Sequence, residues 1–505
     1  MESGWADGYQ SDVEYQHGFF NALTPASLRL ALLMKGFRPA PEGNRFSYCE
    51  LGYGQGVTLC GMAAANPQAT FWGTDFNPSH ALSARRLAGD AGLQNLHLEE
   101  CSFAEYLELD LPQFDVIALH GVYSWVSAAN RAHIVEFLRR RLKLGGVVYV
   151  SYNAMPGWSA RAPLRRLIAD AARHGPRSAT ARLEKALDLA KRLQAAKAQF
   201  FEVSPDARAA LENWSARSRP YLVHELLNQE QTPKYLSEVA AEFDAAKLSF
   251  ATSVRLDDHL DSMALSREMQ QLLGEAGDPV QRETLRDHLL MTPFRTDLFV
   301  RGAERLTADQ QAELLMDCRF ALLTDARRAR GKSYGARGVA LKPEMTDALI
   351  DGLERGPRSL RELSEDRKVA ELGYGRTLRS MVALICDGQV SACLDAEVDS
   401  RRASTDRFNH VVLQRALVND EVQHLVSPVT GNAMPVSYLD RLFILALRSG
   451  LDPVEFPTRI FTTRKMSLAR DGKPVPGEEM EAEIRNRLSQ AVEYLLPTYG
   501  KLHIA

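Results

Sequence analysis

The chain has 505 residues, of which 45% are hydrophobic and 25% are charged, and its formal net charge is −3. This length exceeds what one hydrophobic core normally supports, so we expect two or three domains. The small net charge excludes a general electrostatic attraction to nucleic acid, and no apolar run is long enough to cross a bilayer as a helix.

Residues 45–158 alternate between strand-like and helix-like segments, after a lead-in over residues 1–44 that we expect to cover the functional site. Helical patterns separate the strand-like segments from one another. Strands that alternate with helices predict a parallel sheet with helices on both faces. The strand-like runs lie at residues 46–51, 70–75, 96–100, 114–120 and 146–152.

The pattern changes after this region, because residues 159–245 contain only helical segments. Two strand-like runs return within residues 246–303, and we assign them to the end of the same sheet. Residues 304–400 look like a separate unit, in which helix, helix, helix and strand follow one another as in a winged-helix module. Residues 401–505 are predicted to form a mixed C-terminal domain.

A glycine-rich segment follows the first predicted strand, in the sequence SYCELGYGQGVTLC. Gly52, Gly54 and Gly56 let the backbone approach a ligand closely, and the helix that follows offers unpaired N–H groups at its N-terminus. The next predicted strand ends on Asp75, where a carboxylate can accept both hydroxyls of a ribose. This arrangement predicts a site for a ligand that contains a nucleoside.

Two classes of nucleotide-type site compete for this motif. A dinucleotide enzyme carries G-x-G-x-x-G, whereas the third glycine comes one residue earlier here, in ELGYGQG. The earlier spacing is the form of class I S-adenosylmethionine methyltransferases, whose sheet needs two more strands after the fifth, the last of them antiparallel. We therefore predict an α/β fold, namely a class I (Rossmann-like, seven-stranded) methyltransferase domain with a helical insertion and a C-terminal mixed α+β region.

Several segments resemble bacterial methyltransferases that carry a methyltransferase regulatory domain, namely ELGYGQG, GTDFNPSH, FDVIALHGVYSWV, SYNAMPGW and YLVHELLN. The rickettsial-type protein lysine methyltransferases, which act on outer-membrane protein, are similar. The resemblance covers residues 10–260 well and the remainder loosely. It implies S-adenosyl-L-methionine as the cofactor and a protein side-chain nitrogen as the acceptor. Leu23, Thr24 and Pro25 stand where the family has Thr-His-Pro, so no role of that histidine is carried over.

Aromatic side chains follow the fourth and fifth predicted strands, whose carboxyl ends meet at one edge of the sheet. Methyl transfer requires a positioned, unprotonated nucleophile, and a free lysine amine has a pKa of about 10.4. Aromatic walls that exclude water favour the neutral amine. For each aromatic residue, packing in the core or at the rim is the alternative, and His120 is as often a structural donor. The predicted catalytic and acceptor-pocket residues are Tyr123, Trp125, His120, Tyr152, Asn153 and Trp158.

The cofactor side of the site is predicted from the ends of the first four strands. Glu50 is expected to orient the glycine loop or the amine of the cofactor, and Ser102 with Phe103 occupies the position that lines the adenine pocket in class I enzymes. A core position is the alternative for Phe103. His224 and Glu225 match a His-Glu pair of the family, with a surface ion pair as the alternative. The predicted cofactor-binding residues are Glu50, Gly52, Gly54, Gly56, Asp75, Phe76, Ser102, Phe103 and His120.

Neither a metal nor a nucleic-acid substrate is expected. The sequence HELLN lacks the second histidine of a zinc protease motif, and HGVY stands where base methyltransferases place Asn/Asp-Pro-Pro-aromatic. The six cysteines are scattered without metal-type spacing, and the polar, acidic start does not resemble a signal peptide. We therefore expect a cytoplasmic protein without membrane insertion, and a homodimer through the helical insertion.

The prediction from sequence is an S-adenosylmethionine-dependent methyltransferase with protein lysine as the acceptor. The region beyond residue 304 is expected to dock the protein substrate or to regulate the enzyme. One alternative is a small-molecule N- or O-methyltransferase. The other is a non-catalytic interaction protein that retains the cofactor-binding fold.

Overall fold

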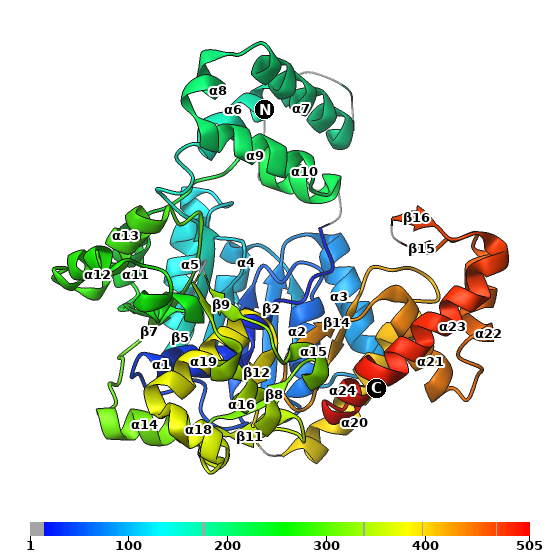
Figure 1. The fold of residues 1–505 in the computed structure, drawn as a ribbon. Coiled ribbons are helices and arrows are strands. Elements are labelled where there is room, and N and C mark those ends of the chain that lie inside the picture. The colour runs from blue at the N-terminus through cyan, green and yellow to red at the C-terminus, as the bar shows by residue number, and fades with distance from the viewer. Residues whose placement is uncertain are drawn as a thin grey trace.

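A central sheet forms the middle of the molecule, with one group of helices standing above its edge and the C-terminal elements packed beside it (Figure 1). The computed structural model describes residues 15–173, 176, 178–336, 339–395, 397–470 and 472–504. Residues 1–14, which the sequence assigns to the lead-in over the site, lie outside the described residues.

The central sheet has seven strands in the order β3-β2-β1-β4-β5-β7-β6. Strands β1 to β5 are parallel, whereas β7 is antiparallel to both β5 and β6. This is the strand pattern predicted for a class I methyltransferase. The strands are β1 (Ser47–Leu51), β2 (Thr70–Asp75), β3 (Leu96–Glu100), β4 (Phe114–Leu119), β5 (Leu142–Asn153), β6 (Ser249–Ser253) and β7 (Phe294–Val300).

Both faces of this sheet are buried, because successive side chains of a strand point to opposite faces. In β4, Val116 and Ala118 enter one hydrophobic core, whereas Ile117 and Leu119 enter the other. The first core also contains residues of α1 (Pro25–Met34), α2 (Val57–Ala65) and α3 (Pro78–Asp90). The second contains residues of α4 (Phe103–Glu108), α5 (Ala128–Arg141) and α11 (Leu236–Asp244).

The helices inserted after β5 form a bundle with a core of their own, above the sheet in Figure 1. In α7, Leu183, Ala186, Leu187 and Ala190 are buried, and their spacing of three and four residues places them on one face of the helix. The predicted helical insertion is therefore present. Its helices are α6 (Arg161–Ala172), α7 (Ala179–Ala195), α8 (Gln199–Val203), α9 (Pro205–Ser215) and α10 (Arg219–Leu227).

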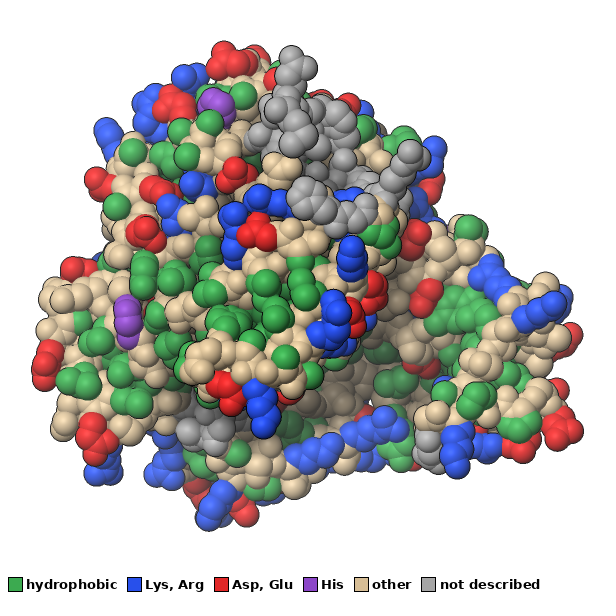
Figure 2. Space-filling model, turned by 90° about the horizontal axis from the view of Figure 1, so that it is seen from above, with side chains coloured by type: hydrophobic (Ala, Val, Ile, Leu, Met, Phe, Trp, Pro, Cys, Tyr) green, Lys and Arg blue, Asp and Glu red, His purple; other side chains and the backbone are tan. Residues whose placement is uncertain are grey.

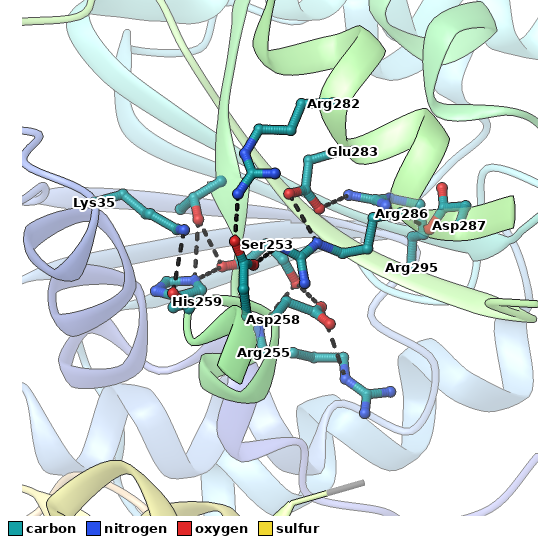
Figure 3. A network of polar contacts seen from close by, with 12 residues as sticks. Lys35, Ser253, Arg255, Asp258, His259, Arg282, Glu283, Arg286, Asp287 and Arg295 are labelled. Atoms are coloured by element: carbon teal, nitrogen blue, oxygen red, sulfur yellow. Dashed lines mark hydrogen bonds and ion pairs between the residues drawn. The ribbon is translucent and has the colours of Figure 1, made fainter. Parts of the chain in front are cut away.

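A buried network of charged residues ties α13 (Pro279–Leu290), which follows α12 (Arg267–Gly274), to the last strand of the sheet along the chain, β7 (Figure 3). Arg295 on β7 donates to Asp287 Oδ1 at 2.7 Å and to Asp297 Oδ2 at 2.8 Å. Both aspartates are almost fully buried, so removing the arginine would leave two uncompensated charges in the interior. The network thus holds β7 to α13.

The C-terminal region begins with α14 (Ala308–Asp317) and contains a three-stranded sheet in the order β11-β8-β12, besides short hairpins. The segments of the predicted winged-helix unit form α16, α17, α19 and β12, with β11 and α18 between them, and the winged-helix assignment stays a prediction. No helix within the described ranges is long and apolar enough to cross a membrane. The main elements are β8 (Arg319–Leu322), α16 (Pro343–Leu353), β11 (Arg358–Ser359), α17 (Leu360–Ser364), α18 (Arg367–Leu372), α19 (Tyr374–Cys386), β12 (Val390–Ala392), α20 (Val398–Arg415), β13 (His424–Val426), β14 (Ala433–Pro435), α21 (Tyr438–Arg448), α22 (Glu455–Thr463), α23 (Met480–Gln490) and α24 (Leu496–Lys501).

The C-terminal region shares its hydrophobic core with the methyltransferase sheet, which corrects the expectation of a separate unit beyond residue 304. A single core runs from the strands through α2 to Phe408 on α20 and Val426 on β13. A Cβ atom on Gly61 of α2 would lie 2.9 Å from a methyl group of Val426, so the two elements are in close contact. The side of α2 that points away from the sheet is apolar as well, and the C-terminal region covers this side.

Candidate active site

A cavity of about 200 Å³ lies between the carboxyl ends of the first four strands and helix α10. A smaller cavity of about 30 Å³ adjoins it beside the glycine loop, and Tyr15, Gly52, Gly54 and His120 line both. The sequence predicts the site at the carboxyl ends of the strands, where class I folds bind their ligands, and both cavities lie at this edge of the sheet.

The glycine loop passes between β1 and α2 in a conformation that other residues rarely adopt. Gly52, Gly54 and Gly56 have φ angles of +79°, +56° and +70°. A Cβ on Gly52 would lie 2.6 Å from Val122, and one on Gly56 would lie 2.5 Å from Ala84, so these two glycines allow close packing. Gly54 differs, because its Cβ would have no neighbour nearer than 3.9 Å and would point into the cavity.

Asp75 at the end of β2 holds the glycine loop in place. Its Oδ2 accepts a hydrogen bond of 2.8 Å from the backbone N–H of Gly54, and its Oδ1 accepts one of 2.9 Å from Asn77. His80 Nδ1 lies 3.2 Å from the same Oδ1. This anchoring was not predicted from the sequence, whereas the expected contact of Asp75 with ribose hydroxyls stays a prediction.

Glu50 ends β1 beneath the loop and is 3% exposed. Its Oε2 atom is buried and has no hydrogen-bond partner in the part of the chain that the structure describes. Burial, with a smaller contribution from the charge of Asp75, raises the pKa of Glu50 to about 8. A buried acceptor of this kind suits a cationic group placed in the smaller cavity, which Glu50 lines.

His120 ends β4 and faces both cavities, but it is a weak base. Burial lowers its pKa to about 4, so the imidazole is neutral at physiological pH. Its Nδ1 lies 2.9 Å from the hydroxyl of Tyr149 and 3.2 Å from that of Ser151. These contacts fix the ring, and they favour the structural alternative for His120 over a general base.

Of the four aromatic residues predicted for the acceptor pocket, Trp125 lines the main cavity. The guanidinium carbon of Arg165 on α6 lies 5.9 Å from the centre of its ring. The same arginine, 8% exposed, donates to the carbonyl oxygen of Asn228, just after α10. Arg165 therefore ties Trp125 and α10 together across the cavity.

The other predicted acceptor-pocket residues do not line the cavity, and this is a correction. Tyr123 is buried in the core, where its hydroxyl donates to Glu242 on α11. Tyr152 donates to Asp297 at 2.7 Å and so belongs to the charged network of the last strand. Trp158 packs in the core of the inserted bundle, and the Asn153 side chain is buried outside the cavity wall. Tyr152 and Asn153 end β5, and Tyr123 and Trp158 follow β4 and β5, but all four pack beside the crevice rather than in its wall.

The predicted cofactor-binding residues all line one of the two cavities, including Phe76, Ser102 and Phe103 in the larger one. The local sequence explains their positions. Asn77 caps α3, with Pro78 at its first turn, and Ser102 forms a capping box with Glu105 at the start of α4. Both helices therefore begin directly at the strand ends, which holds Phe76 and Phe103 at the cavity.

Sequence reasoning missed several residues of the opposite wall, among them Tyr15, Asn130, Tyr221 and Asn228. The ring of Tyr15, in the lead-in, meets the ring of His224 edge-on with the centroids 5.2 Å apart. His224 and Glu225 also lie in this wall, and His224 is 4% exposed, so this pair does not lie on the surface. Two sequence signals pointed to this wall, namely the lead-in expected over the site, which includes Tyr15, and the His-Glu pair in YLVHELLN.

The cavity fits S-adenosylmethionine on two observations of the chain itself. A Cβ on Gly54 would contact only the ring of Tyr15, at 3.9 Å, so a larger side chain would enter the cavity that both residues line. The buried Oε2 atom of Glu50 has no hydrogen-bond partner among the described residues, which suits an ammonium group. Within the described residues, no group of three or more His, Cys, Asp or Glu side chains could hold a metal ion.

Comparisons with known proteins identify two family domains in the chain. The family described as methyltransferase domain matches residues 49–148, and that described as predicted methyltransferase regulatory domain matches residues 218–301. The second match begins at α10, so the regulatory domain supplies the wall with Tyr221 and Glu225 as well as the last two strands.

One relative, the uncharacterized protein sll1526 of Synechocystis, is 36% identical over 507 residues, which cover 99% of this chain and 100% of that protein. The uncharacterized protein RP028 of Rickettsia prowazekii is 30% identical over 157 residues, covering 31% of this chain and 62% of that protein. The solved structure of PKMT2 from Rickettsia typhi in complex with AdoHcy has the same fold. Its TM-score is 0.70 at 18% identity, covering 95% of this chain and 98% of that chain. The protein therefore belongs to the S-adenosylmethionine-dependent methyltransferases that carry a methyltransferase regulatory domain, together with its full-length relative sll1526.

Proposed function

We propose that this enzyme transfers methyl groups to lysine side chains of proteins. The observation that carries the proposal is the cavity wall opposite the glycine loop, where Trp125, Tyr221 and Glu225 come together. Aromatic faces and a carboxylate attract a cationic side chain, and burial lowers the pKa of an amine. The resemblance to the rickettsial-type lysine methyltransferases and the shared fold of PKMT2 support the same class of acceptor.

Different residues of the chain bind the cofactor and position the acceptor. When bound, S-adenosylmethionine supplies a methyl group on a positively charged sulfur. We propose that Asp75 keeps the glycine loop in place for it, that Glu50 accepts its ammonium group, and that Phe76 and Phe103 enclose its adenine ring. Trp125 then positions the acceptor nitrogen and excludes water from it, which lowers the barrier to an in-line displacement.

The outer surface supports a protein acceptor rather than nucleic acid. Seen from above, the face with the inserted helices carries Lys and Arg side chains interspersed with Asp and Glu (Figure 2). A phosphate backbone is bound by a continuous basic track, which a mixed surface does not provide. We further propose that α16 to β12, with the element order of a winged helix, docks the protein substrate, since the sheet is complete at β7.

Binding of S-adenosylmethionine should release a proton from Glu50. With a pKa of about 8, Glu50 is protonated at pH 7 in the free protein, and an ammonium group beside it favours the ionised form. Titration calorimetry at pH 7, in buffers of different ionisation enthalpy, measures the released proton. Glu50→Gln should abolish the release and weaken binding at least about tenfold. An unchanged release in Glu50→Gln would show that another group titrates.

The acceptor is tested by incubating the enzyme with labelled S-adenosylmethionine and a lysate, and then locating the modified atom by mass spectrometry. We expect label on lysine Nζ atoms of proteins, and a higher kcat/KM for the intact protein than for its short lysine peptide, because remote contacts help to position the acceptor. Label on a small metabolite would favour the small-molecule alternative. Absence of any transfer despite cofactor binding would favour the non-catalytic one.

Two further expectations stay predictions. We propose that the chain acts in the cytoplasm, and that it forms a homodimer through the inserted helices, on which Val203 is 68% exposed. Cell fractionation tests the first, and light scattering of the purified protein tests the second.

A further inference from the structure

We infer that Glu225 is the general base of the reaction, which takes a proton from the ammonium group of the incoming lysine. The inference deepens the proposed function and rests on it. Glu225 lies on α10 and lines the main cavity from that helix, whereas Gly52 and Gly54 line it from the loop after β1. Glu225 therefore lies on the side of the cavity that we assign to the acceptor, away from the glycine loop, which Asp75 holds in place and beneath which Glu50 lies.

The other candidates in the cavity are less suited to the task. Among the described residues that line it, Asp75 and Glu225 are the carboxylates, and Asp75 already accepts bonds from Gly54 and Asn77. His120 is neutral and is held by Tyr149 and Ser151. Tyr123 donates to Glu242 outside the cavity, and burial raises its pKa further above its usual value.

Glu225 is held in position by its neighbours. Tyr221, one turn earlier on α10, donates a hydrogen bond to its carboxylate. Arg165 approaches the backbone of α10, with its Nε donating to the Glu225 carbonyl oxygen at 3.4 Å and its Nη2 to that of Asn228. Because Arg165 also lies over Trp125, one arginine sets the distance between the base and the aromatic wall.

The surroundings of Glu225 tune its affinity for a proton. Burial raises its pKa to about 7, and the positive charge of Arg165 and the hydrogen bond from Tyr221 partly offset that rise. A base with a pKa near the working pH is both available as the carboxylate and able to hold a proton. The titratable and charged groups around it are Tyr221 and His224 on its own helix, Arg161 and Arg165 on α6, and Tyr15 from the lead-in.

The step conserves atoms and charge. The lysine ammonium gives one proton to a Glu225 oxygen, which turns an ion pair into two neutral groups, a change that a dry cavity favours over water. The lone pair left on the nitrogen forms the new N–C bond, while the electron pair of the breaking S–C bond stays on sulfur. The nitrogen of the product carries the positive charge, and Glu225 passes its proton to solvent when the product leaves.

Single-turnover methylation of a lysine peptide by the full chain, measured as a function of pH, tests the inference. The wild-type rate should rise with pH through about 7, where Glu225 becomes the carboxylate. In Glu225→Gln the rise of the rate with pH should disappear and the rate should fall at least about 100-fold. Glu225→Asp should recover part of the rate. Glu212→Gln, an exposed glutamate on α9, is the matched control and should behave as wild type.

A spectroscopic measurement separates a base from a packing residue. Difference infrared spectra of the enzyme with S-adenosylhomocysteine should show a carboxylic acid band that titrates near pH 7 and is absent from Glu225→Gln. A wild-type rate and pH profile in Glu225→Gln would overturn the inference. It would also be overturned if the rise of the rate with pH disappeared in His224→Gln but not in Glu225→Gln. If wild type methylates no lysine at all, the proposed function fails instead, whatever the infrared titration shows.

Discussion

A Gly54→Val variant should fold and yet bind no S-adenosylmethionine. The Cβ of residue 54 points into the main cavity and meets nothing nearer than 3.9 Å, so the valine fills ligand space rather than protein interior. A positive φ of +56° costs a non-glycine residue roughly 1–2 kcal/mol, against a typical stability of about 5–15 kcal/mol. Titration calorimetry measures the binding, and a thermal melt shows that the fold persists.

The matched control for this variant is Gly43→Val. Gly43 has a φ of +62° and nothing within 4 Å of its Cβ, but it lies on the exposed lead-in. Both substitutions therefore carry similar backbone strain, and only the first enters the cavity. If Gly54→Val bound S-adenosylmethionine with wild-type affinity, the glycine loop would not be part of the cofactor site.

A chain that ends at Gly302 should not yield a soluble folded protein. Its sheet would be complete, but the truncation strips the outer side of α2 of its cover, including Phe408, Leu425 and Val426. Burying one apolar side chain contributes roughly 1.5–3 kcal/mol, so exposing several side chains that this cover protects costs an amount comparable to a typical stability of about 5–15 kcal/mol. Size-exclusion chromatography and circular dichroism of the truncated chain measure the outcome.

Two point variants check the reason for this expectation. Val426→Asp places a charge in the shared core, where residue 426 is fully buried, and should lower the melting temperature strongly. Val418→Asp, at a residue that is 79% exposed, should leave it almost unchanged. A soluble, cofactor-binding truncation would show instead that the catalytic sheet stands alone, as the sequence suggests.

The strands, the glycine loop and the cofactor side of the cavity follow from local sequence patterns. Gly52, Gly54 and Gly56 stand between a strand and a helix, and Asp75 ends the next strand, so short-range periodicity and turn chemistry place them. The carboxyl ends of parallel strands meet at one edge, and this topological rule alone brings the two segments together.

The acceptor side could not be placed by the same rule. Trp125 and Tyr123 follow the same strand, yet the first lines the cavity and the second donates to Glu242, because the direction of a side chain after a strand depends on what packs against it. Tyr152 similarly turns to Asp297. Sequence position selects the strand end, and packing selects the face.

The sequence by itself determined the class of fold, the cofactor and the residues of the glycine-loop side of the cavity, because each depends on neighbours along the chain. The tertiary structure alone decided that α10 closes the cavity and that Glu225 lines it. It also decided that the C-terminal region shares the core of the sheet through α2 and Val426. These contacts join segments far apart in the sequence, and they form because an apolar face must be covered by whatever complementary surface the whole chain brings to it.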